Sequence, residues 1–219
     1  MIFSKRKPTP TSKKRNLVTF TNPNSLISDQ FRTIRTNLHF LTEERKNKVL
    51  LITSTGKGEG KSTITANLAV SMAQQKERVL LIDANLREAS IHKIFKVSNN
   101  IGLTDLLTRQ LNLEEVVTKT EFGNLDVLTS GAISYNPVEL LANSTVKELF
   151  KKIMDSYDIV LIDSPSINEF TETRVLANQC DGVVLVLNRG KTDIENTNEA
   201  SRIIELSHGK LIGAIFNEK

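Results

Sequence analysis

The clearest chemical signature in this chain is a glycine-rich segment with one lysine and two hydroxyls: Gly58, Glu59, Gly60, Lys61, Ser62 and Thr63. An apolar run, 49–52, precedes it, and a helical pattern, 64–72, follows it. A turn between a strand and a helix points backbone N–H groups at anionic oxygens, and the helix N-terminus adds its positive dipole end. In such a loop Lys61 reaches the β- and γ-phosphates of a nucleotide, and the Ser62 hydroxyl ligates Mg²⁺.

The loop departs from the strict pattern at its first position, where Thr55 replaces glycine. The deviant form of this loop carries an extra lysine five places before Lys61, but that place is Gly56. Because Lys57 comes one position late, the spacing does not assign it the deviant-loop role. A solvated loop lysine explains Lys57 at least as well.

Two further candidates are aspartates that end apolar runs, Asp83 after 80–82 and Asp163 after 160–162. Ligands of parallel sheets bind at the carboxyl ends of the strands, so both acids are expected beside the phosphate loop. Mg²⁺ prefers carboxylates together with phosphate oxygens, and both acids are candidate ligands. Asp83 is also placed to orient a nucleophile or accept its proton. Strand-end aspartates also form turns, but their pairing with the loop favours the metal or catalytic role.

Strand and helix patterns alternate from residue 48 onward, which predicts an α/β fold: a parallel sheet with helices on both faces, of the P-loop nucleoside-triphosphatase type. The strands are expected at 48–53, 78–83, 125–128, 158–163, 182–187 and 211–216. The main helices are expected at 61–74, 136–141, 145–157, 171–178 and 193–207, with short helices within 90–118.

The N-terminal part differs in composition from the rest. Residues 1–24 contain three of the five prolines, and 1–16 carry six basic residues and no acid, which leaves a net charge of −2 on the remainder. We interpret 1–24 as a basic, flexible lead-in. A helix with Ser25 or Ser28 as its cap is expected over 25–44, inside a single domain that covers 25–219. Six charges without interleaved aromatics do not predict specific nucleic-acid binding.

Together these motifs resemble the bacterial tyrosine kinases of capsular and exopolysaccharide biosynthesis, which are P-loop proteins related to the partitioning and cell-division-site ATPases. Segment 29–37 looks like the family's oligomerisation helix, and 53–63 looks like its Walker A motif. Segment 81–87 looks like the second acidic motif, called Walker A′, and 162–165 looks like Walker B. Within 128–141 the chain is similar to a further stretch characteristic of the family.

The resemblance implies ATP and Mg²⁺ as cofactors, catalysis by Lys61, Asp83 and Asp163, and contact of Asn217 with the adenine ring. It implies a ring of subunits joined through the N-terminal helix, with Asp29, Arg32 and Arg35 as the joining residues. The implied partners are a transmembrane activator and substrate proteins that carry tyrosine. The implied location is the cytoplasm, at the inner face of the cell membrane and held there by that partner.

Several positions depart from the family pattern. Asn85 replaces the second acid of the Walker A′ motif, and the family's later aspartate falls at Glu172. The only tyrosines are Tyr135, expected in a loop, and Tyr157, expected to pack in the fold. Without a tyrosine-rich tail, we expect a chain that acts on other proteins, is truncated or has lost autophosphorylation.

Two alternatives remain open from the sequence. Asn85 and the missing tail also fit an ATP-binding regulatory subunit with little kinase activity, since asparagine cannot take a proton at neutral pH. A partitioning-type ATPase is the other alternative, and the absence of lysine at position 56 argues against it.

Overall fold

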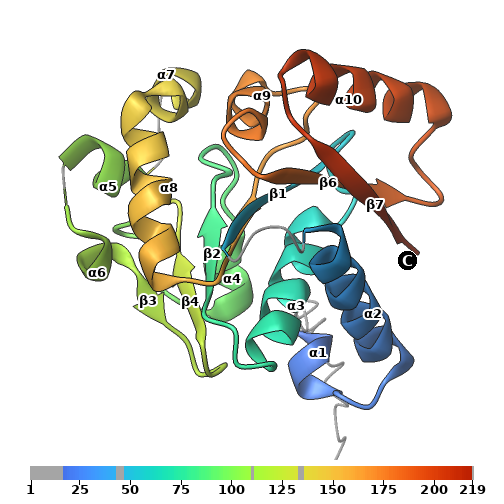
Figure 1. Cartoon of the computed structure of the whole chain (residues 1–219), viewed down its shortest axis with the longest axis horizontal. Helices are drawn as coiled ribbons and strands as arrows, with labels where there is room; N and C mark the ends of the chain where they lie inside the picture. Colours follow the sequence, from blue (N-terminus) through green and yellow to red (C-terminus); the bar gives the residue numbers. More distant parts are fainter. Residues whose placement is uncertain (1–16, 43–46, 110, 133–135, 219) are drawn as a thin grey trace, which may run out of the picture.

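The chain forms a seven-stranded, mostly parallel sheet between two layers of helices (Figure 1). The computed structural model describes residues 17–42, 47–109, 111–132 and 136–218. The strand order is β3-β4-β2-β5-β1-β6-β7, and only β3 pairs antiparallel to its neighbour. The strands are β1 Lys48–Ser54, β2 Val79–Asp83, β3 Thr118–Lys119, β4 Leu125–Leu128, β5 Ile159–Asp163, β6 Gly182–Asn188 and β7 Leu211–Asn217.

The helices divide between the two faces of the sheet. One face packs against α1 Val18–Thr21, α2 Leu26–Leu41, α3 Lys61–Ala73 and α4 Ile91–Phe95. The other packs against α5 Leu103–Arg109, α6 Leu113–Val116, α7 Pro137–Ala142, α8 Ser144–Ser156, α9 Thr171–Ala177 and α10 Ile194–Leu206. The fold class predicted from the sequence is therefore confirmed, whereas the short antiparallel strand β3 and the short helix α1 were not predicted.

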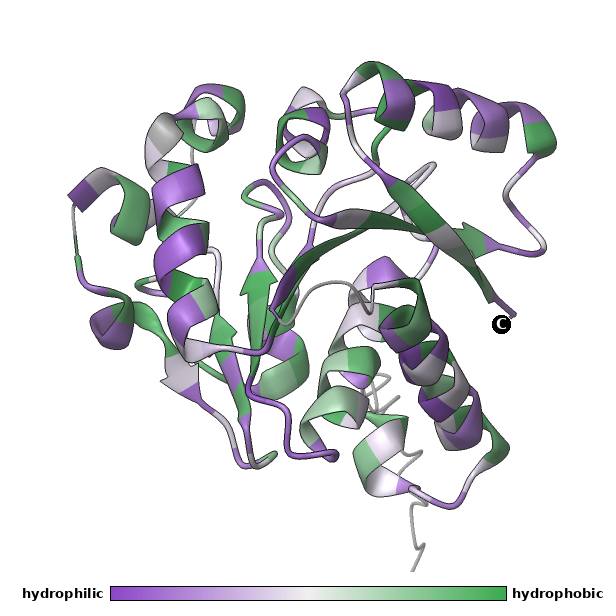
Figure 2. Cartoon of the chain, in the orientation of Figure 1, coloured by the Kyte–Doolittle hydropathy of each residue, from purple (hydrophilic) through white to green (hydrophobic). Residues whose placement is uncertain are grey.

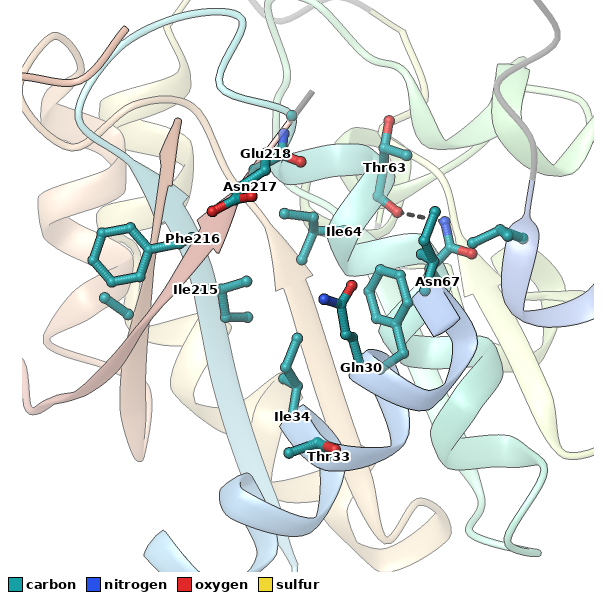
Figure 3. Close-up of a pocket in the computed structure, with 15 residues that line it drawn as sticks. Gln30, Thr33, Ile34, Thr63, Ile64, Asn67, Ile215, Phe216, Asn217 and Glu218 are labelled. Atoms are coloured by element: carbon teal, nitrogen blue, oxygen red, sulfur yellow. Dashed lines mark hydrogen bonds between the residues drawn. The ribbon is translucent and has the colours of Figure 1, made fainter. Parts of the chain in front are cut away.

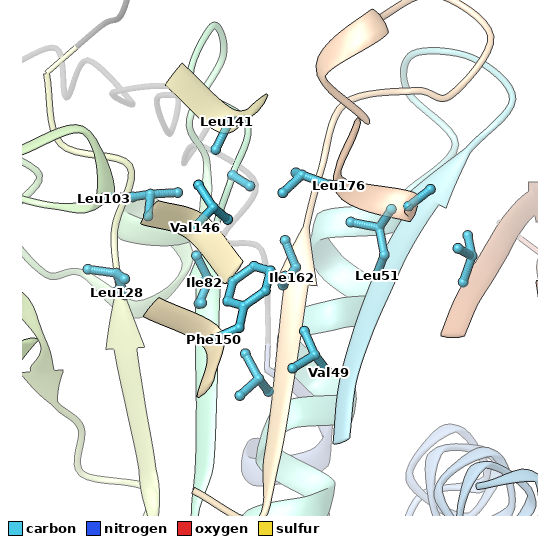
Figure 4. Packing of buried hydrophobic residues seen from close by; sticks show 14 of the residues in the cluster. Val49, Leu51, Ile82, Leu103, Leu128, Leu141, Val146, Phe150, Ile162 and Leu176 are labelled. Carbon is cyan, nitrogen blue, oxygen red and sulfur yellow. The ribbon is translucent and has the colours of Figure 1, made fainter. Parts of the chain in front are cut away.

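Alternation along the strands explains how one sheet supports two cores. In β1, Leu50 and Ile52 face the α3 layer, whereas Val49 and Leu51 face the α8 layer. Figure 4 shows this second core, where Phe150 of α8 packs against residues of neighbouring strands. Because both faces are covered, the central strands carry consecutive apolar residues in their middle parts, which Figure 2 colours green.

The same alternation fixes the direction of the two candidate acids. Val79 and Leu81 of β2 face the α3 layer, so Asp83, two residues further on, points to the same side. Asp163 follows Leu161 in β5 in the same way, and the register pairs Asp83 directly with Asp163. The sheet therefore delivers two carboxyl groups side by side at the edge where α3 begins.

The folded part of the chain begins earlier than predicted. Helix α1 covers Val18–Thr21, and the Thr19 side chain and backbone bond to Asn67 of α3 at 3.1 Å. Leu17 and Thr19 are buried, so the packed chain reaches Leu17 rather than Ser25, whereas 1–16 lie outside the described residues. Helix α2 begins after Ser25, whose hydroxyl accepts from the Ser28 N–H, as predicted for a cap.

The three charged residues of α2 do not share one exposed face. Asp29 and Arg32 are exposed and form an ion pair with each other. Arg35 is buried, and its guanidinium donates to the carbonyl and hydroxyl oxygens of Ser71 in α3. The expectation that all three residues are free to meet another molecule is therefore wrong for Arg35, because this side chain fastens α2 to α3 within the chain.

None of the described helices combines the length and the apolarity that crossing a bilayer requires.

Helix α3 is the packing centre of its layer, and a cavity there should be costly. For Leu68→Ala, at a site with 0 % exposure, we expect a loss of about 2–5 kcal/mol in the free energy of unfolding. The measurement is urea unfolding followed by circular dichroism. Leu206→Ala, the same change at a 65 % exposed site, should alter stability by about 0.5 kcal/mol or less. Equal losses in the two variants would contradict this view of the core.

Candidate functional site

The phosphate-binding loop is shaped by a buried carboxylate at its centre. Glu59 has 2 % exposure and accepts hydrogen bonds from the N–H and hydroxyl of Thr55 at 2.9 and 2.8 Å. It also accepts from the Gly56 N–H at 3.2 Å and from the Thr192 hydroxyl, which comes from the β6–α10 connection. Glu59 therefore ties the start of the turn, at Thr55 and Gly56, to its own position before Gly60 and to Thr192.

Gly60 needs to be glycine for two reasons. Its φ of 92° lies in the left-handed region, and a Cβ there would collide with the amide of Asn217. That amide, at the end of β7, donates to the Glu59 carbonyl at 2.9 Å. Lys191, next to Thr192, donates to the Lys57 carbonyl on the other side of the loop. The loop conformation thus depends on residues from the C-terminal third of the chain.

The expected phosphate ligands follow directly after Gly60. Lys61 is the first residue of α3 and is 8 % exposed, and Ser62 and Thr63 are half-buried in its first turn. This first turn has no side-chain cap, so its N–H groups remain available to an anion.

Asp163 is fully buried, and neither of its carboxylate oxygens has a hydrogen-bond partner within the described residues. Burial raises its pKa, and the neighbouring Asp83 raises it further. The hydroxyls of Ser62 and Thr65 and the charge of Lys61 act in the opposite direction, although neither hydroxyl reaches full hydrogen-bond geometry.

Asp83 is also fully buried, but its oxygens are engaged. Oδ2 accepts from the N–H groups of Ser90 and Ile91, each at 2.9 Å, and Oδ1 accepts from the Asn85 N–H at 3.2 Å. Burial raises the pKa of Asp83, and these three donors partly offset the shift. Asp83 therefore orders the loop that follows β2, whereas Asp163 has unused acceptor capacity.

The orphaned oxygens of Asp163 fit a cation better than they fit an apolar core. An uncompensated buried carboxylate is costly, and Mg²⁺ bound through one or two carboxylates, a hydroxyl and phosphates would satisfy it. Within the described residues there is no group of three or more acidic, histidine or cysteine side chains that could hold a metal alone. The donor set of Ser62, Asp163 and Asp83 therefore fits Mg²⁺ that arrives with a nucleotide.

A cavity of about 630 Å³ opens beside the phosphate loop, between α2, α3 and β7 (Figure 3). Ile34 of α2, Ile64 of α3 and Ile215 of β7 give it apolar walls. Asn217 and Gly60 lie at its border, whereas Lys61, Asp83 and Asp163 do not line it. The cavity thus adjoins the Asn217 side of the loop and is separate from the two acids.

The structure brings most of the predicted site together. The loop residues 58–63, both aspartates and Asn217 meet at the carboxyl edge of the sheet, whereas the oligomerisation residues lie on α2. Lys57 is exposed and pairs with Glu88, which agrees with a solvated loop lysine. Asn85 accepts from the Glu88 N–H at 3.0 Å and so stabilises its own loop.

Of the two tyrosines, only Tyr157 lies within the described residues. Tyr157 donates to Asp126 at 2.9 Å, and its partial burial confirms that it packs in the fold. Tyr135 lies outside the described residues.

Sequence reasoning missed the residues that support the site from a distance. Thr192 and Lys191 belong to no motif and lie about 130 positions from the loop that they contact. Glu172 is buried and accepts from Arg87 at 2.6 Å, which joins the loop after β2 to α9. The sequence held one signal for this contact, an acid at position 172 shortly after the Walker B segment. From the sequence, Glu172 is identified only as a family position, with no partner assigned to it.

Comparison with known proteins shows which sequences and structures this chain is similar to. A family model described as an AAA domain matches residues 47–208. The tyrosine-protein kinase YwqD of Bacillus subtilis (strain 168) is 44% identical over 214 residues, which cover 98% of this chain and 90% of that protein.

Solved structures agree with these matches. The chimerical protein CapA2B2 superposes with a TM-score of 0.87 at 35% identity, covering 92% of this chain and 88% of that one. The kinase domain of the Escherichia coli tyrosine kinase ETK gives 0.89 at 30% identity, covering 97% and 84%. The septum site-determining protein MinD of Pyrococcus horikoshii OT3, complexed with Mg-ADP, gives 0.67 at 27% identity, covering 78% and 70%.

The buried, unpartnered carboxylate predicts a pH-dependent stability. Because the pKa of Asp163 is raised in the fold, ionisation of this carboxyl group destabilises the folded state relative to the unfolded state. Stability of the nucleotide-free protein should therefore fall as pH rises from about 4 towards neutrality. Asp163→Asn should be more stable than the parent at pH 7.5, by on the order of 1–3 kcal/mol, and nearly equal at pH 4.

Urea unfolding at the two pH values measures this difference. Asp155→Asn is the matched control, since Asp155 is exposed near the end of α8 and should show no such pH dependence. A parent protein that is more stable than Asp163→Asn at pH 7.5 would contradict the assignment.

Proposed function

This chain belongs to the bacterial protein-tyrosine kinases of capsular and exopolysaccharide biosynthesis, and we propose that Lys61, Asp83 and Asp163 carry its phosphoryl transfer. The observation that carries the proposal is the orphaned carboxylate of Asp163, which lies beside the register partner Asp83 and near Lys61. The reaction moves the γ-phosphoryl group of ATP to a tyrosine hydroxyl of a protein substrate.

The loop and Lys61 perform positioning and charge compensation. The backbone N–H groups of 58–63 bind the phosphate oxygens, and the Lys61 ammonium offsets the charge that spreads over the transferring group. Ser62 and Asp163 hold Mg²⁺, which when bound neutralises charge on the β- and γ-phosphates. Since the Asp163 carboxylate has no hydrogen-bond partner among the described residues, it would give up no contact with them in this role.

Asp83 is proposed as the acceptor of the tyrosine proton. Its Oδ1 atom accepts one hydrogen bond, so it keeps capacity for the substrate hydroxyl. Its raised pKa brings its basicity nearer to the working pH, as a general base requires. Because Asp83 has no exposed surface, we expect the loop 84–90 to shift when the acceptor binds.

The adenine ring is proposed to lie against Asn217, at the border of the cavity between α2 and β7. The Asn217 amide already contacts the phosphate loop, so a base held there would be joined to the phosphates over a short span. Apolar side chains such as Ile64 and Ile215 offer a surface for one face of the ring.

The assembly is proposed from the family. Asp29 and Arg32 are exposed on α2 and remain candidates for contact between subunits in a ring. A transmembrane activator is the proposed partner, and through it the chain would act at the inner face of the membrane. Exposed apolar side chains near the cavity, Ile27 and Phe216, are compatible with a protein partner at this place. The regulatory-subunit and partitioning alternatives are not favoured, since the relatives carry the name tyrosine-protein kinase.

Removal of the loop lysine tests the proposed chemistry. Lys61→Met should lower the rate of phosphate transfer to a tyrosine-containing protein by about 100-fold or more, since charge stabilisation in the transition state is lost. The measurement is incorporation of labelled phosphate from ATP with Mg²⁺, and calorimetry should show weakened ATP binding. Lys57→Met is the matched control, because Lys57 is an exposed lysine of the same loop.

Two results would count against the proposal. Equal activity of Lys61→Met and the parent would reject the role of Lys61. Tight ATP binding by the parent without any phosphotyrosine, and transfer that appears in Asn85→Asp, would instead favour a regulatory subunit.

The proposed ring has its own test. Arg32→Ala should reduce the mass measured by light scattering if Arg32 joins subunits, with the melting temperature nearly unchanged because Arg32 is exposed. Arg35→Ala should lower the melting temperature, since it removes a buried bond to α3. An assembly of unchanged mass in Arg32→Ala would show that this residue does not join subunits.

A further inference from the structure

A second cavity, of about 490 Å³, lies between the loop that follows β2 and the loop that follows β4. Its border is formed by residues 86–90, 92–93 and 130–131 together with Asn99. Neither the phosphate loop nor Asn217 contributes to it. The reaction proposed above therefore leaves this cavity without a role.

Two cationic side chains at the cavity keep donor capacity among the described residues. Lys93 is exposed on α4 and has no ion pair among the described residues. Arg87 stacks over the Phe170 ring at 5.4 Å and donates to Glu172 through Nε alone. Among the described residues neither terminal nitrogen of Arg87 has a hydrogen-bond partner, so both can offer the fork geometry that matches a carboxylate or a phosphate.

Two buried polar atoms at the same place also lack partners. The Ser90 hydroxyl has no hydrogen-bond partner although Ser90 is only 9 % exposed, and Nδ1 of His92 is likewise unpaired. Burial and the charge of Lys93 lower the pKa of His92, so its ring is neutral near pH 7 and adds no charge. Buried polar atoms are normally paired, so these two atoms indicate that a polar group of a bound molecule completes their hydrogen bonds.

The local charges leave a positive excess. Three carboxylates lie at or near the cavity: Glu88 on its border pairs with Lys57, Glu172 pairs with Arg87, and Asp83 lies near Lys61. Lys93 is the cation that remains uncompensated. A group that entered this cavity would meet donors from Arg87, Ser90 and Lys93, so it should be an anion.

The cavity is also joined to the proposed proton acceptor. Ser90, which lines the cavity, donates its N–H to Oδ2 of Asp83 at 2.9 Å. A protein substrate whose tyrosine reaches Asp83 must therefore place neighbouring residues over the loop 84–93. One side chain next to the tyrosine is then within reach of the cavity.

We propose that this cavity binds an anionic side chain of the protein substrate, close in sequence to the acceptor tyrosine. The inference rests on the proposed kinase function and adds a substrate preference to it. Carboxylate and phosphate share the chemistry that the donors recognise, so an acidic residue and an already phosphorylated residue are the two possible sources. Tyrosines with acidic neighbours are accordingly the better substrates.

Labelled heptapeptides with a central tyrosine provide the test. The two residues that flank the tyrosine are both glutamate, both glutamine or both phosphoserine. Dissociation constants are measured by fluorescence anisotropy with the full chain, Mg²⁺ and a non-hydrolysable ATP analogue, and phosphorylation is measured separately with ATP. The glutamate peptide should bind about five- to ten-fold more tightly than the glutamine peptide. The phosphoserine arm identifies which anion is preferred.

Three variants locate the effect. Lys93→Glu and Ser90→Ala should each remove most of the preference for the glutamate peptide over the glutamine peptide. Lys96→Glu makes the same charge change three residues away on a side chain that does not line the cavity, and it should keep the preference. Ser90→Ala should not lower the melting temperature, because the hydroxyl that it removes has no partner.

The outcomes separate this inference from the kinase function. Equal dissociation constants for the glutamate and glutamine peptides would overturn the inference, even if both peptides were phosphorylated. An equal loss of preference in Lys93→Glu and Lys96→Glu would overturn it too, since general surface charge would then explain the effect. If no peptide is phosphorylated, the kinase proposal fails, whereas a preference in binding that Lys93→Glu removes still supports the anion site.

Discussion

The pairing of β2 with β5 sets two aspartates opposite each other in a position without access to water. Two buried carboxylates that are register partners repel each other, and burial alone already disfavours their charged forms. The chain offers one nearby cation, Lys61, and three backbone donors that serve only Asp83. The remaining deficit falls on Asp163, so the fold carries a local electrostatic cost that the proposed divalent cation would relieve. A site of this kind couples nucleotide binding to stability, since the ligand brings the missing charge.

The shape of the phosphate loop has a different origin from its charge. Glycine supplies the left-handed conformation at position 60, but the turn is held by Glu59, whose carboxylate accepts from Thr55 and Gly56 at the start of the loop and from Thr192. Asn217 adds a contact from β7. The residues proposed to bind phosphate and the residues that shape the loop are therefore largely separate sets. Because these donors engage the Glu59 carboxylate, its place in the middle of the loop is compatible with the proposed binding of an anion.

Much of the architecture could be predicted, because each buried strand contains a short apolar run and surface helices such as α2 and α8 have a periodic apolar stripe. The motif residues of the site were predictable for the same reason, as their spacing is local. What the sequence could not indicate was the partner of a side chain across the fold. Arg35 has the spacing of an exposed residue, yet α3 covers it, and Thr19 lies in a proline-rich lead-in, yet it bonds to Asn67. Lys191 and Thr192 carry no periodic signal, since single long-range hydrogen bonds leave none.

The hydrogen bond from Asn217 to the Glu59 carbonyl joins positions 158 residues apart. A ribosome releases the chain from its N-terminus, so the glycine-rich turn is exposed long before its last brace has been made. Until β7 adds to the edge of β6, nothing from that strand holds the turn in its final form. Nucleotide capture should therefore come late in biogenesis, when nearly all of the polypeptide has emerged. Nascent chains that stop short of β7 would contain every residue of the phosphate loop, 58–63, and would still lack the loop conformation that nucleotide binding requires.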